Sequence, residues 1–399
     1  MLAACTTPKR TETVDSVLAR AIVVDTHIDA PFRIERAPED LSQRSDKGQF
    51  DLVRAREGHL GAAFMSIFVP SSEDEAGRGI ELADRLIDHV EALVASAPEL
   101  ASVASCVDDV RRDAASGRIA LALGMENGGP LAGRADALAH FYARGVRYVT
   151  MAHAKSNAYA DSSYDGEQRW QGLSPAGKAL VADLNAMGIM VDVSHVSEKA
   201  FWQIVEASRA PVIASHSSVR HFTPDFERNV SDEMIRAIAE KGGVVQINFG
   251  SGFISQPAHE WEVRRNEAFK RFFVETGAKP DSAQARKFIA DYAARYPYPR
   301  ATIDVVLDHI DYVAKLVGVE HVGLGSDFEG VGDTLPTGLE DTSKYPNLVQ
   351  GLLARGYSGD QIRMVLGENL LRVWSAVERY ATEHGHPPAC RGASSAAAQ

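Results

Sequence analysis

The sequence predicts an α/β fold, a (β/α)8 TIM barrel, and three observations support this prediction. Eight short apolar runs recur along the chain, of the kind that is buried on both faces of a parallel sheet. Helical patterns separate most of these runs. Polar side chains suited to metal binding or catalysis follow many of them. In a parallel barrel the carboxyl ends of the strands surround one pocket, so these side chains would meet there.

The apolar runs are the expected strands. They cover residues 21–24, 62–68, 118–123, 146–151, 188–193, 211–214, 243–247 and 321–325. Three intervening segments have clear helix signals: Ser174 followed by proline, a pattern beginning at Ser197, and a pattern from Ser231 that stops at two glycines. Repeated strand–helix alternation favours a closed barrel over an open sheet.

The chain is expected to form one domain. Its 399 residues are 45% hydrophobic and 24% charged, which is typical of a soluble globular protein, and barrels with insertions reach this length. We expect a flexible segment over 1–15, a barrel domain over 16–383 and a disordered tail over 384–399. A charged segment over 256–300, after the seventh predicted strand, has a helical pattern and is interpreted as a helical insertion that forms a lid or rim.

Charge and hydropathy restrict the partners. The net charge of −12, with no basic stripe to offset it, argues against nucleic acid as a partner. No segment approaches the ~20 apolar residues needed to span a bilayer. The sequence leaves open whether the protein is a monomer or a homodimer.

The amino terminus contains a short motif of its own. Leu2-Ala-Ala-Cys5 resembles the lipobox of bacterial lipoproteins, although the charged and apolar regions that should precede it are absent. We favour a lipid anchor through Cys5 and a location in the cell envelope, lipid-anchored or periplasmic. An accidental match and a cytoplasmic location are the alternatives. The other cysteines are Cys106 and Cys390, and three cysteines exclude both a structural zinc ribbon and a disulfide scaffold.

Seven side chains at expected strand ends are suited to metal binding or catalysis. They are His27, Asp29, Glu126, His153, His195, His216 and Asp327. His27 and Asp29 are one residue apart and therefore project to the same side of an extended segment. His195 and His216 end consecutive strands, and the two oxygens of Glu126 would let it bridge two ions. Histidine nitrogen combined with carboxylate oxygen is typical of zinc coordination.

Each of these residues has a structural alternative. Asp25 is expected either to cap a turn or to support His27 from outside the ligand set. We interpret four further histidines as ordinary hydrogen-bonded residues: His59, His89, His140 and His259. A single histidine or glutamate is weak evidence, whereas the recurrence at successive strand ends is strong evidence.

The segments that contain these residues resemble the membrane (renal) dipeptidase family of zinc peptidases, which have amidohydrolase-like barrels. The resemblance lies in residues 24–29, 124–127, 150–153, 191–195, 214–218, 228–229, 246–249 and 322–328. These segments occur in the order of the family and cover most of the barrel. The chain is therefore expected to be a bacterial member, with a barrel of the metal-dependent hydrolase type.

The resemblance implies a binuclear site with two Zn²⁺ per subunit. His27, Asp29 and Asp327 would hold one ion, His195 and His216 the other, and Glu126 would bridge them. It also implies that His153 and Arg228 face a small peptide substrate, and we expect Asn248 to join them. Arg220 is an alternative to Arg228 because the spacing from His216 to Arg228 is long.

The expected function is a zinc-dependent dipeptidase that hydrolyses L,L and L,D dipeptides through a metal-bridging hydroxide. His153 would stabilise the oxyanion, and Asp327 would carry a proton to the leaving amine. Arg228 would pair with the carboxylate of the substrate. One alternative is another binuclear zinc hydrolase of the amidohydrolase type, acting on a cyclic amide or lactone. A non-catalytic binding lipoprotein is the second alternative, but it would require missing ligands, and none is missing.

Overall fold

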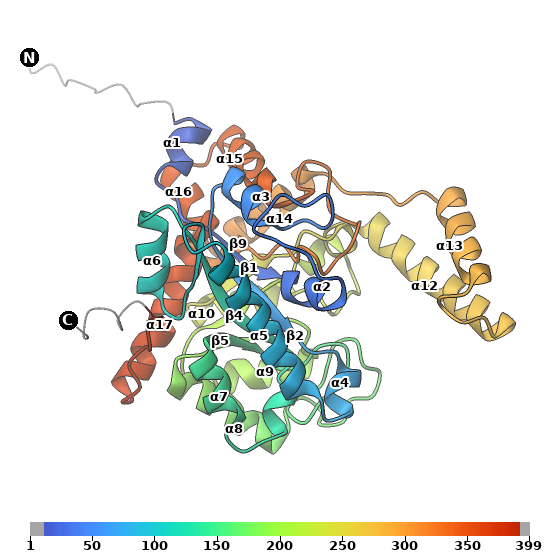
Figure 1. Ribbon diagram of the computed structural model, residues 1–399, viewed down its shortest axis with the longest axis horizontal. Helices are drawn as coiled ribbons and strands as arrows, with labels where there is room; N and C mark the ends of the chain where they lie inside the picture. Colours follow the sequence, from blue (N-terminus) through green and yellow to red (C-terminus); the bar gives the residue numbers. More distant parts are fainter. Residues whose placement is uncertain (1–11, 392–399) are drawn as a thin grey trace, which may run out of the picture.

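Eight parallel strands close into a barrel in the computed structural model, which describes residues 12–391 (Figure 1). They are β1 (Val23–Ile28), β2 (Leu60–Phe68), β4 (Ile119–Glu126), β5 (Val146–Thr150), β6 (Met190–Asp192), β7 (Val212–Ala214), β8 (Val244–Ile247) and β9 (Val322–Leu324). Each strand pairs with the next, and β9 returns to pair with β1. The predicted (β/α)8 TIM barrel is confirmed.

The sequence patterns missed a further strand, β3 (Ala101–Val103), because three residues are too few for a recognisable period. Ala120 of β4 pairs with Ala62 of β2 on one edge and with Ser102 of β3 on the other. Strand β5 pairs with β4 only from Leu123 onward. The short strand β3 therefore extends the sheet at the amino-terminal end of the barrel, outside the closed ring.

Helices surround the barrel. Those of eight or more residues are α5 (Gly79–Ser96), α6 (Val107–Ala115), α7 (Ala137–Arg144), α8 (Pro175–Met187), α9 (Glu198–Ala207), α10 (Asp232–Glu240), α12 (Gln256–Thr276), α13 (Ala283–Arg295), α14 (Ile303–Val317), α15 (Tyr345–Ala354) and α17 (Asn369–Glu383). Shorter ones are α1 (Val14–Leu18), α2 (Ala30–Arg36), α3 (Leu52–Glu57), α4 (Ser71–Glu75), α11 (Ser251–Ile254), α16 (Gly359–Arg363) and the π-helical η5 (Met364–Glu368). Short 3₁₀ turns are η1 (Gly129–Ala132), η2 (Arg220–Phe222), η3 (Val319–His321) and η4 (Thr342–Lys344). Ser174, Ser197 and Ser231 cap α8, α9 and α10, as predicted.

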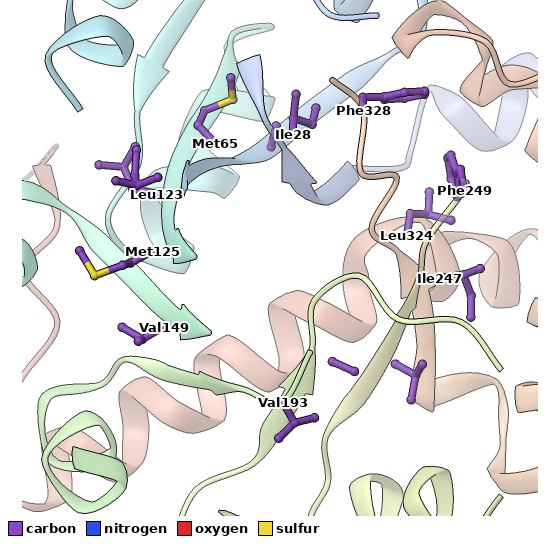
Figure 2. Packing of buried hydrophobic residues seen from close by; sticks show 14 of the residues in the cluster. Ile28, Met65, Leu123, Met125, Val149, Val193, Ile247, Phe249, Leu324 and Phe328 are labelled. Atoms are coloured by element: carbon purple, nitrogen blue, oxygen red, sulfur yellow. The ribbon is translucent and has the colours of Figure 1, made fainter. Parts of the chain in front are cut away.

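Apolar side chains alternate along the strands between two cores. In β2, Ala63, Met65 and Ile67 belong to the larger core, which includes the surrounding helices. Figure 2 shows labelled side chains of this core distributed round the ring of strands. Ala62 and Phe64 belong instead to a smaller core inside the barrel. Burial on both faces explains why the strands appear in the sequence as continuous apolar runs.

Helix α17 closes the amino-terminal end of the barrel. Its Trp374 is fully buried in the interior core, and its ring centroid lies 5.1 Å from that of Phe64. The Nδ2 of Asn369 donates to the carbonyl of Val322 at the start of β9, which fixes the helix to the strand. The carboxyl ends of the strands are left as the open face.

Helices α12 and α13 fall within the predicted insertion and project from the barrel as a hairpin (Figure 1). Their aromatic side chains pack on each other, and Phe272 and Phe288 are stacked with centroids 4.1 Å apart. The first turns of α12 remain next to the barrel, where Ala258 is buried.

The carboxyl-terminal segment differs from expectation. We predicted a disordered tail over 384–399, but the structure describes residues 384–391 as an exposed segment that is linked to the barrel by a disulfide between Cys106 and Cys390. Ser105 Oγ also donates to the carbonyl of Ala389 at 2.6 Å. The two cysteines are 284 positions apart, so their spacing gave no signal of a pair. Residues 392–399 of the tail, like Cys5, lie outside the described residues.

Candidate active site

The predicted ligands meet at the carboxyl ends of the strands. The Nε2 of His27 lies 3.4 Å from Asp29 Oδ2 and 3.3 Å from Glu126 Oε2. The other oxygen, Glu126 Oε1, lies 3.1 Å from His195 Nε2 and 3.2 Å from His216 Nε2. Each oxygen of Glu126 therefore faces a different group of ligands, as a bridging carboxylate would.

Three overlapping groups have ligand atoms that all lie within 4.8 Å of one another. They are His27 with Asp29 and Asp327; His27 with Glu126 and His216; and Glu126 with His153 and His195. The overlap at His27 and Glu126 makes the groups parts of one continuous site. His153 belongs to one group, so the geometry brings this residue within reach of a metal as well as of the substrate.

Two of these residues have an unusual backbone conformation. His195 has φ 68° and Asp327 has φ 62°, the left-handed region that non-glycine residues seldom adopt. Such conformations cost about 1–3 kcal/mol each and persist where the surroundings impose them. The amide of Asp327, for example, donates to the carbonyl of His27 at 3.1 Å. The fold thus constrains both residues at the ends of their strands.

Several buried polar atoms of the candidate ligands form no hydrogen bond within residues 12–391. They include His27 Nε2, Asp29 Oδ1 and His195 Nδ1. Buried polar atoms are rarely left without partners unless an ion or ligand supplies one. The set of nitrogen and carboxylate donors suits zinc, so these residues fit the predicted metal centre.

The electrostatics also indicate a cation site. Burial, together with the nearby charges of Asp29 and Glu126, raises the pKa of Asp327 to about 8, although His27 opposes this shift. Burial lowers the pKa values of His195 and His216 well below the usual range, with Arg228 contributing to both shifts. Both imidazoles are therefore neutral near pH 7, the form that binds metals.

The ring orientation of two ligands is fixed by residues that the sequence analysis did not select. Tyr148 Oη lies 2.7 Å from His27 Nδ1. On the other side, His216 Nδ1 lies 2.7 Å from Ser215 Oγ, which donates to Asp192 Oδ2 at 2.6 Å. Because Nε2 of both histidines faces the site, Nδ1 carries the hydrogen in each, and these partners hold the required tautomer.

Space for Tyr148 depends on the neighbouring strand, β4. A Cβ at Gly124 would lie 2.0 Å from the Tyr148 ring, so only glycine leaves room for it. The available sequence signal was position: Ser215 precedes His216, and Asp192 lies three residues before His195. Nothing in the sequence linked Tyr148 to His27.

Asp25 holds the backbone and not the imidazole of His27. Its Oδ1 accepts hydrogen bonds from the amides of His27 and Ser326, both at 3.0 Å. Tyr345 Oη donates to Oδ2 at 2.5 Å. Of the two predicted roles, the structure favours the backbone one, since Asp25 ties the end of β1 to the end of β9.

Arg228, and not Arg220, lies beside the candidate metal ligands. The buried guanidinium of Arg228 donates to Ser217 Oγ at 2.6 Å and to the carbonyl of His216 at 2.8 Å, and lies 3.0 Å from His195 Nε2. Arg220 pairs with Glu198 at 3.0 Å and donates to the carbonyl of Asn229, away from the ligands. The alternative of Arg220 is therefore wrong.

The expected substrate-binding role of Asn248 is not supported. Its Nδ2 donates to Asp327 Oδ2 at 2.7 Å, and its Oδ1 accepts from the amide of Gly250 at 2.7 Å. Asn248 is fully buried, and both ends of its amide are used within the protein. In the structure Asn248 orients Asp327, and its contact with substrate stays a prediction.

A cavity of about 760 Å³ opens above the ligands. Phe32, Phe68, Tyr164 and Phe253 give it apolar walls. The insertion helix α12 contributes Glu262 and Arg265, so the insertion forms part of the rim. Two of the histidines expected to be structural, His89 and His140, pair with carboxylates outside this cavity.

Comparisons with known proteins agree with this geometry. The profile of the membrane dipeptidase family, peptidase family M19, matches residues 11–387. An uncharacterized dipeptidase of Schizosaccharomyces pombe is 32% identical over 389 residues, covering 93% of this chain and 85% of the relative. Dipeptidase aclJ of Aspergillus oryzae is 36% identical over 382 residues, covering 92% of this chain and 81% of the relative.

Solved structures share the architecture. The probable dipeptidase PvdM of Pseudomonas aeruginosa superimposes with a TM-score of 0.79 at 29% identity, covering 92% of this chain and 98% of that one. A metallopeptidase of Rhodobacter sphaeroides, solved with a phosphinate mimic of the dipeptide L-Ala-D-Ala, has a TM-score of 0.73 at 25% identity, covering 90% and 99%. The relatives named here include both fungal and bacterial proteins.

Proposed function

The chain belongs to the membrane dipeptidase family and is a metal-dependent dipeptidase, and from this premise we propose that it uses two zinc ions to hydrolyse dipeptides with a free carboxyl terminus. The observation that carries the proposal is the position of Glu126. One oxygen lies 3.3 Å from His27 Nε2, and the other lies 3.1 and 3.2 Å from the Nε2 atoms of His195 and His216. Each oxygen could therefore bind a different cation.

The residues divide between the two ions. His27, Asp29 and Asp327 would hold one, His195 and His216 the other, and Glu126 would contact both. When bound, such a pair of zinc ions lowers the pKa of a shared water so that hydroxide is available near neutral pH. His153 contributes to substrate binding in this proposal, although its Nε2 lies 3.6 Å from Glu126 Oε1.

Side chains of the cavity wall would stabilise the developing negative charge and transfer the proton. Burial lowers the pKa of His153, so the imidazole is neutral and has one N–H to donate to the substrate carbonyl as negative charge develops there. Asp327 takes the proton of the attacking water and delivers it to the leaving amine. Asn248 Nδ2 donates to Asp327 Oδ2 and so fixes the orientation of the carboxylate.

Arg228 is the proposed partner of the substrate's carboxylate. Its Nε is buried without a hydrogen-bond partner among the described residues, and Ser217 fixes the guanidinium. A planar guanidinium matches a carboxylate with two hydrogen bonds. The phosphinate mimic of L-Ala-D-Ala bound by the Rhodobacter relative supports a D-residue in the second position here as well.

Metal analysis of a Glu126→Gln variant tests the binuclear site. The substitution keeps the size of the side chain but removes the charge that holds two cations together. We expect loss of at least one zinc ion and a fall in kcat of several orders of magnitude. A variant that retains both ions and most of its activity would contradict the proposal.

A double-mutant cycle tests Arg228. Arg228→Met and amidation of the dipeptide carboxyl terminus should each depress kcat/KM strongly, because each leaves a buried charged partner unpaired. Together they should be far less than additive, with zinc content unchanged. Fully additive losses would show that Arg228 does not bind this carboxylate.

We further propose a location in the cell envelope. The disulfide between Cys106 and Cys390 supports it, because such bonds persist in oxidising compartments. In residues 12–391, no helix combines the length and the apolar character needed to cross a bilayer. The proposed anchor at Cys5 is tested by mass spectrometry of protein from the membrane fraction, which should show an acylated terminus that Cys5→Ser abolishes.

A further inference from the structure

One side of the cavity rim carries two arginines without acidic partners. Arg36, at the end of α2, and Arg265, on the insertion helix α12, both line the cavity above the ligands. Neither lies within 4.0 Å of a carboxylate in residues 12–391. Arg33, one turn earlier on α2, also lines the cavity but pairs with Glu39 and Glu329.

Aromatic rings hold both guanidinium groups. Arg36 lies 5.9 Å from the ring centroid of Phe32. Arg265 lies 5.4 Å from that of Trp261, and its Nη2 donates to Asn266 Oδ1 at 3.0 Å. Stacking on a ring uses the face of a guanidinium and leaves N–H groups at its edge for an anion. Both arginines are therefore positioned without being neutralised.

The acidic residues of the cavity are already engaged. Asp29, Glu126 and Asp327 belong to the proposed metal centre. Glu329 accepts the amides of Gln49 and Phe50, at 2.7 and 2.8 Å, in addition to Arg33. Glu262 accepts the hydroxyl of Tyr298 at 2.8 Å. With metals bound, the outer cavity has two unpaired guanidinium groups against one carboxylate, that of Glu262.

The position of the two arginines relates them to the substrate. Arg36 follows β1 and Arg265 follows β8, the strands that flank β9, whereas Arg228 contacts His195 and His216 at the ends of β6 and β7. A dipeptide with its carboxylate on Arg228 and its peptide bond at Glu126 would extend its amino-terminal residue away from Arg228, and in this proposal toward the ends of β8, β9 and β1. The cavity of about 760 Å³ leaves room there for a long side chain.

We propose that Arg36 and Arg265 form an anion subsite for a carboxylate on the side chain of the amino-terminal residue of the substrate. The enzyme then prefers dipeptides that begin with glutamate or aspartate. This inference rests on the proposed dipeptidase function and adds a substrate class to it. It also gives the insertion a role, since Arg265 is one of its residues.

The preference is measured with the zinc-loaded enzyme on Glu-Ala and Gln-Ala, which differ only in side-chain charge. We expect kcat/KM to be about tenfold higher for Glu-Ala, the value of one charged hydrogen bond at a partly exposed site. Arg36→Gln and Arg265→Gln should each reduce this ratio, and the double variant should bring it to about one. The ratio cancels any general loss of activity in a variant.

Arg264→Gln is the matched control. Arg264 precedes Arg265 on α12, is exposed, pairs with Glu260 at 3.4 Å and does not line the cavity. Its substitution should leave both activities and their ratio unchanged. Raising the ionic strength should lower the ratio of the wild-type enzyme, because a partly exposed ion pair is screened by salt.

Equal kcat/KM for Glu-Ala and Gln-Ala in the wild type would overturn the subsite, as would a ratio that survives the double variant. A preference for Ala-Glu over Ala-Gln that the double variant removes would overturn the assignment to the amino-terminal residue. Failure of the proposed function has a different signature: the zinc-loaded enzyme would then hydrolyse none of these dipeptides, Ala-Ala included.

Discussion

Replacing Tyr148 by phenylalanine tests whether a phenol outside the ligand set controls the metal centre. The hydroxyl lies 2.7 Å from His27 Nδ1, and both residues are fully buried. Phenylalanine keeps the ring, which packs 5.3 Å from Phe64, and removes only the oxygen. The Nδ1–H of His27 would then be buried without an acceptor.

The expected cost follows from that loss. An unpaired buried donor costs about 1–3 kcal/mol, which corresponds to roughly 5- to 150-fold in a binding constant. Loss of a residue that supports a metal-binding histidine usually lowers metal affinity by about 10–100-fold. We therefore expect Tyr148→Phe to weaken zinc at the site of His27 by about 10–100-fold, while the ion held by His195 and His216 is retained.

Competition with a chromophoric chelator at fixed pH measures both zinc affinities. Tyr345→Phe is the control: Tyr345 is equally buried and loses one hydrogen bond to Asp25, which does not touch the imidazole. The control should lose stability but change zinc affinity less than threefold. Unchanged affinity in Tyr148→Phe, or equal weakening in both variants, would refute the reasoning.

Three further outcomes are expected. His153→Ala should lower kcat by about 10²–10³ with both zinc ions retained, and zinc loss in elemental analysis would identify His153 as a ligand instead. Cys390→Ser should lower the free energy of unfolding by about 3–5 kcal/mol in denaturant, and reduction of the wild type should have the same effect; equal stability would show that the disulfide contributes nothing. Burial lowers the pKa of His309 to about 4 from 6.5, so between these pH values only the unfolded chain binds its proton, and the free energy of unfolding should fall by about 3 kcal/mol from pH 6.5 to 4. His309→Gln should remove this part of the pH dependence, and identical slopes in both proteins would contradict it.

The cluster of candidate metal ligands could be predicted because it depends on one local rule. His27, Glu126, His195 and Asp327 each end an apolar run, and parallel strands bring their carboxyl ends together. The fold could be predicted from the same apolar runs, because a strand that is buried on both faces is apolar whatever loops connect it.

The remaining features depend on contacts that no local pattern encodes. Tyr148 reaches His27 only because Gly124 on the neighbouring strand has no side chain. The amide side chain of Asn248 is of a type that often binds substrates. Only its position beside Asp327 shows that it orients this carboxylate. The disulfide joins residues that are 284 positions apart, a distance over which spacing carries no information.

The closure of the amino-terminal end of the barrel by α17, here called the floor of the barrel, has a consequence for folding during synthesis. Phe64 is translated early, whereas Trp374, which covers it, follows about 300 residues later. At a translation rate of ~5–20 residues per second, roughly 15–60 s pass between the synthesis of Phe64 and that of the helix that covers it. During that interval the strands present apolar residues on the side that α17 will fill, so nascent chains depend on protection from aggregation. Any chain that stops before α17 leaves the floor open, so the barrel cannot complete its core until nearly all of it has been made.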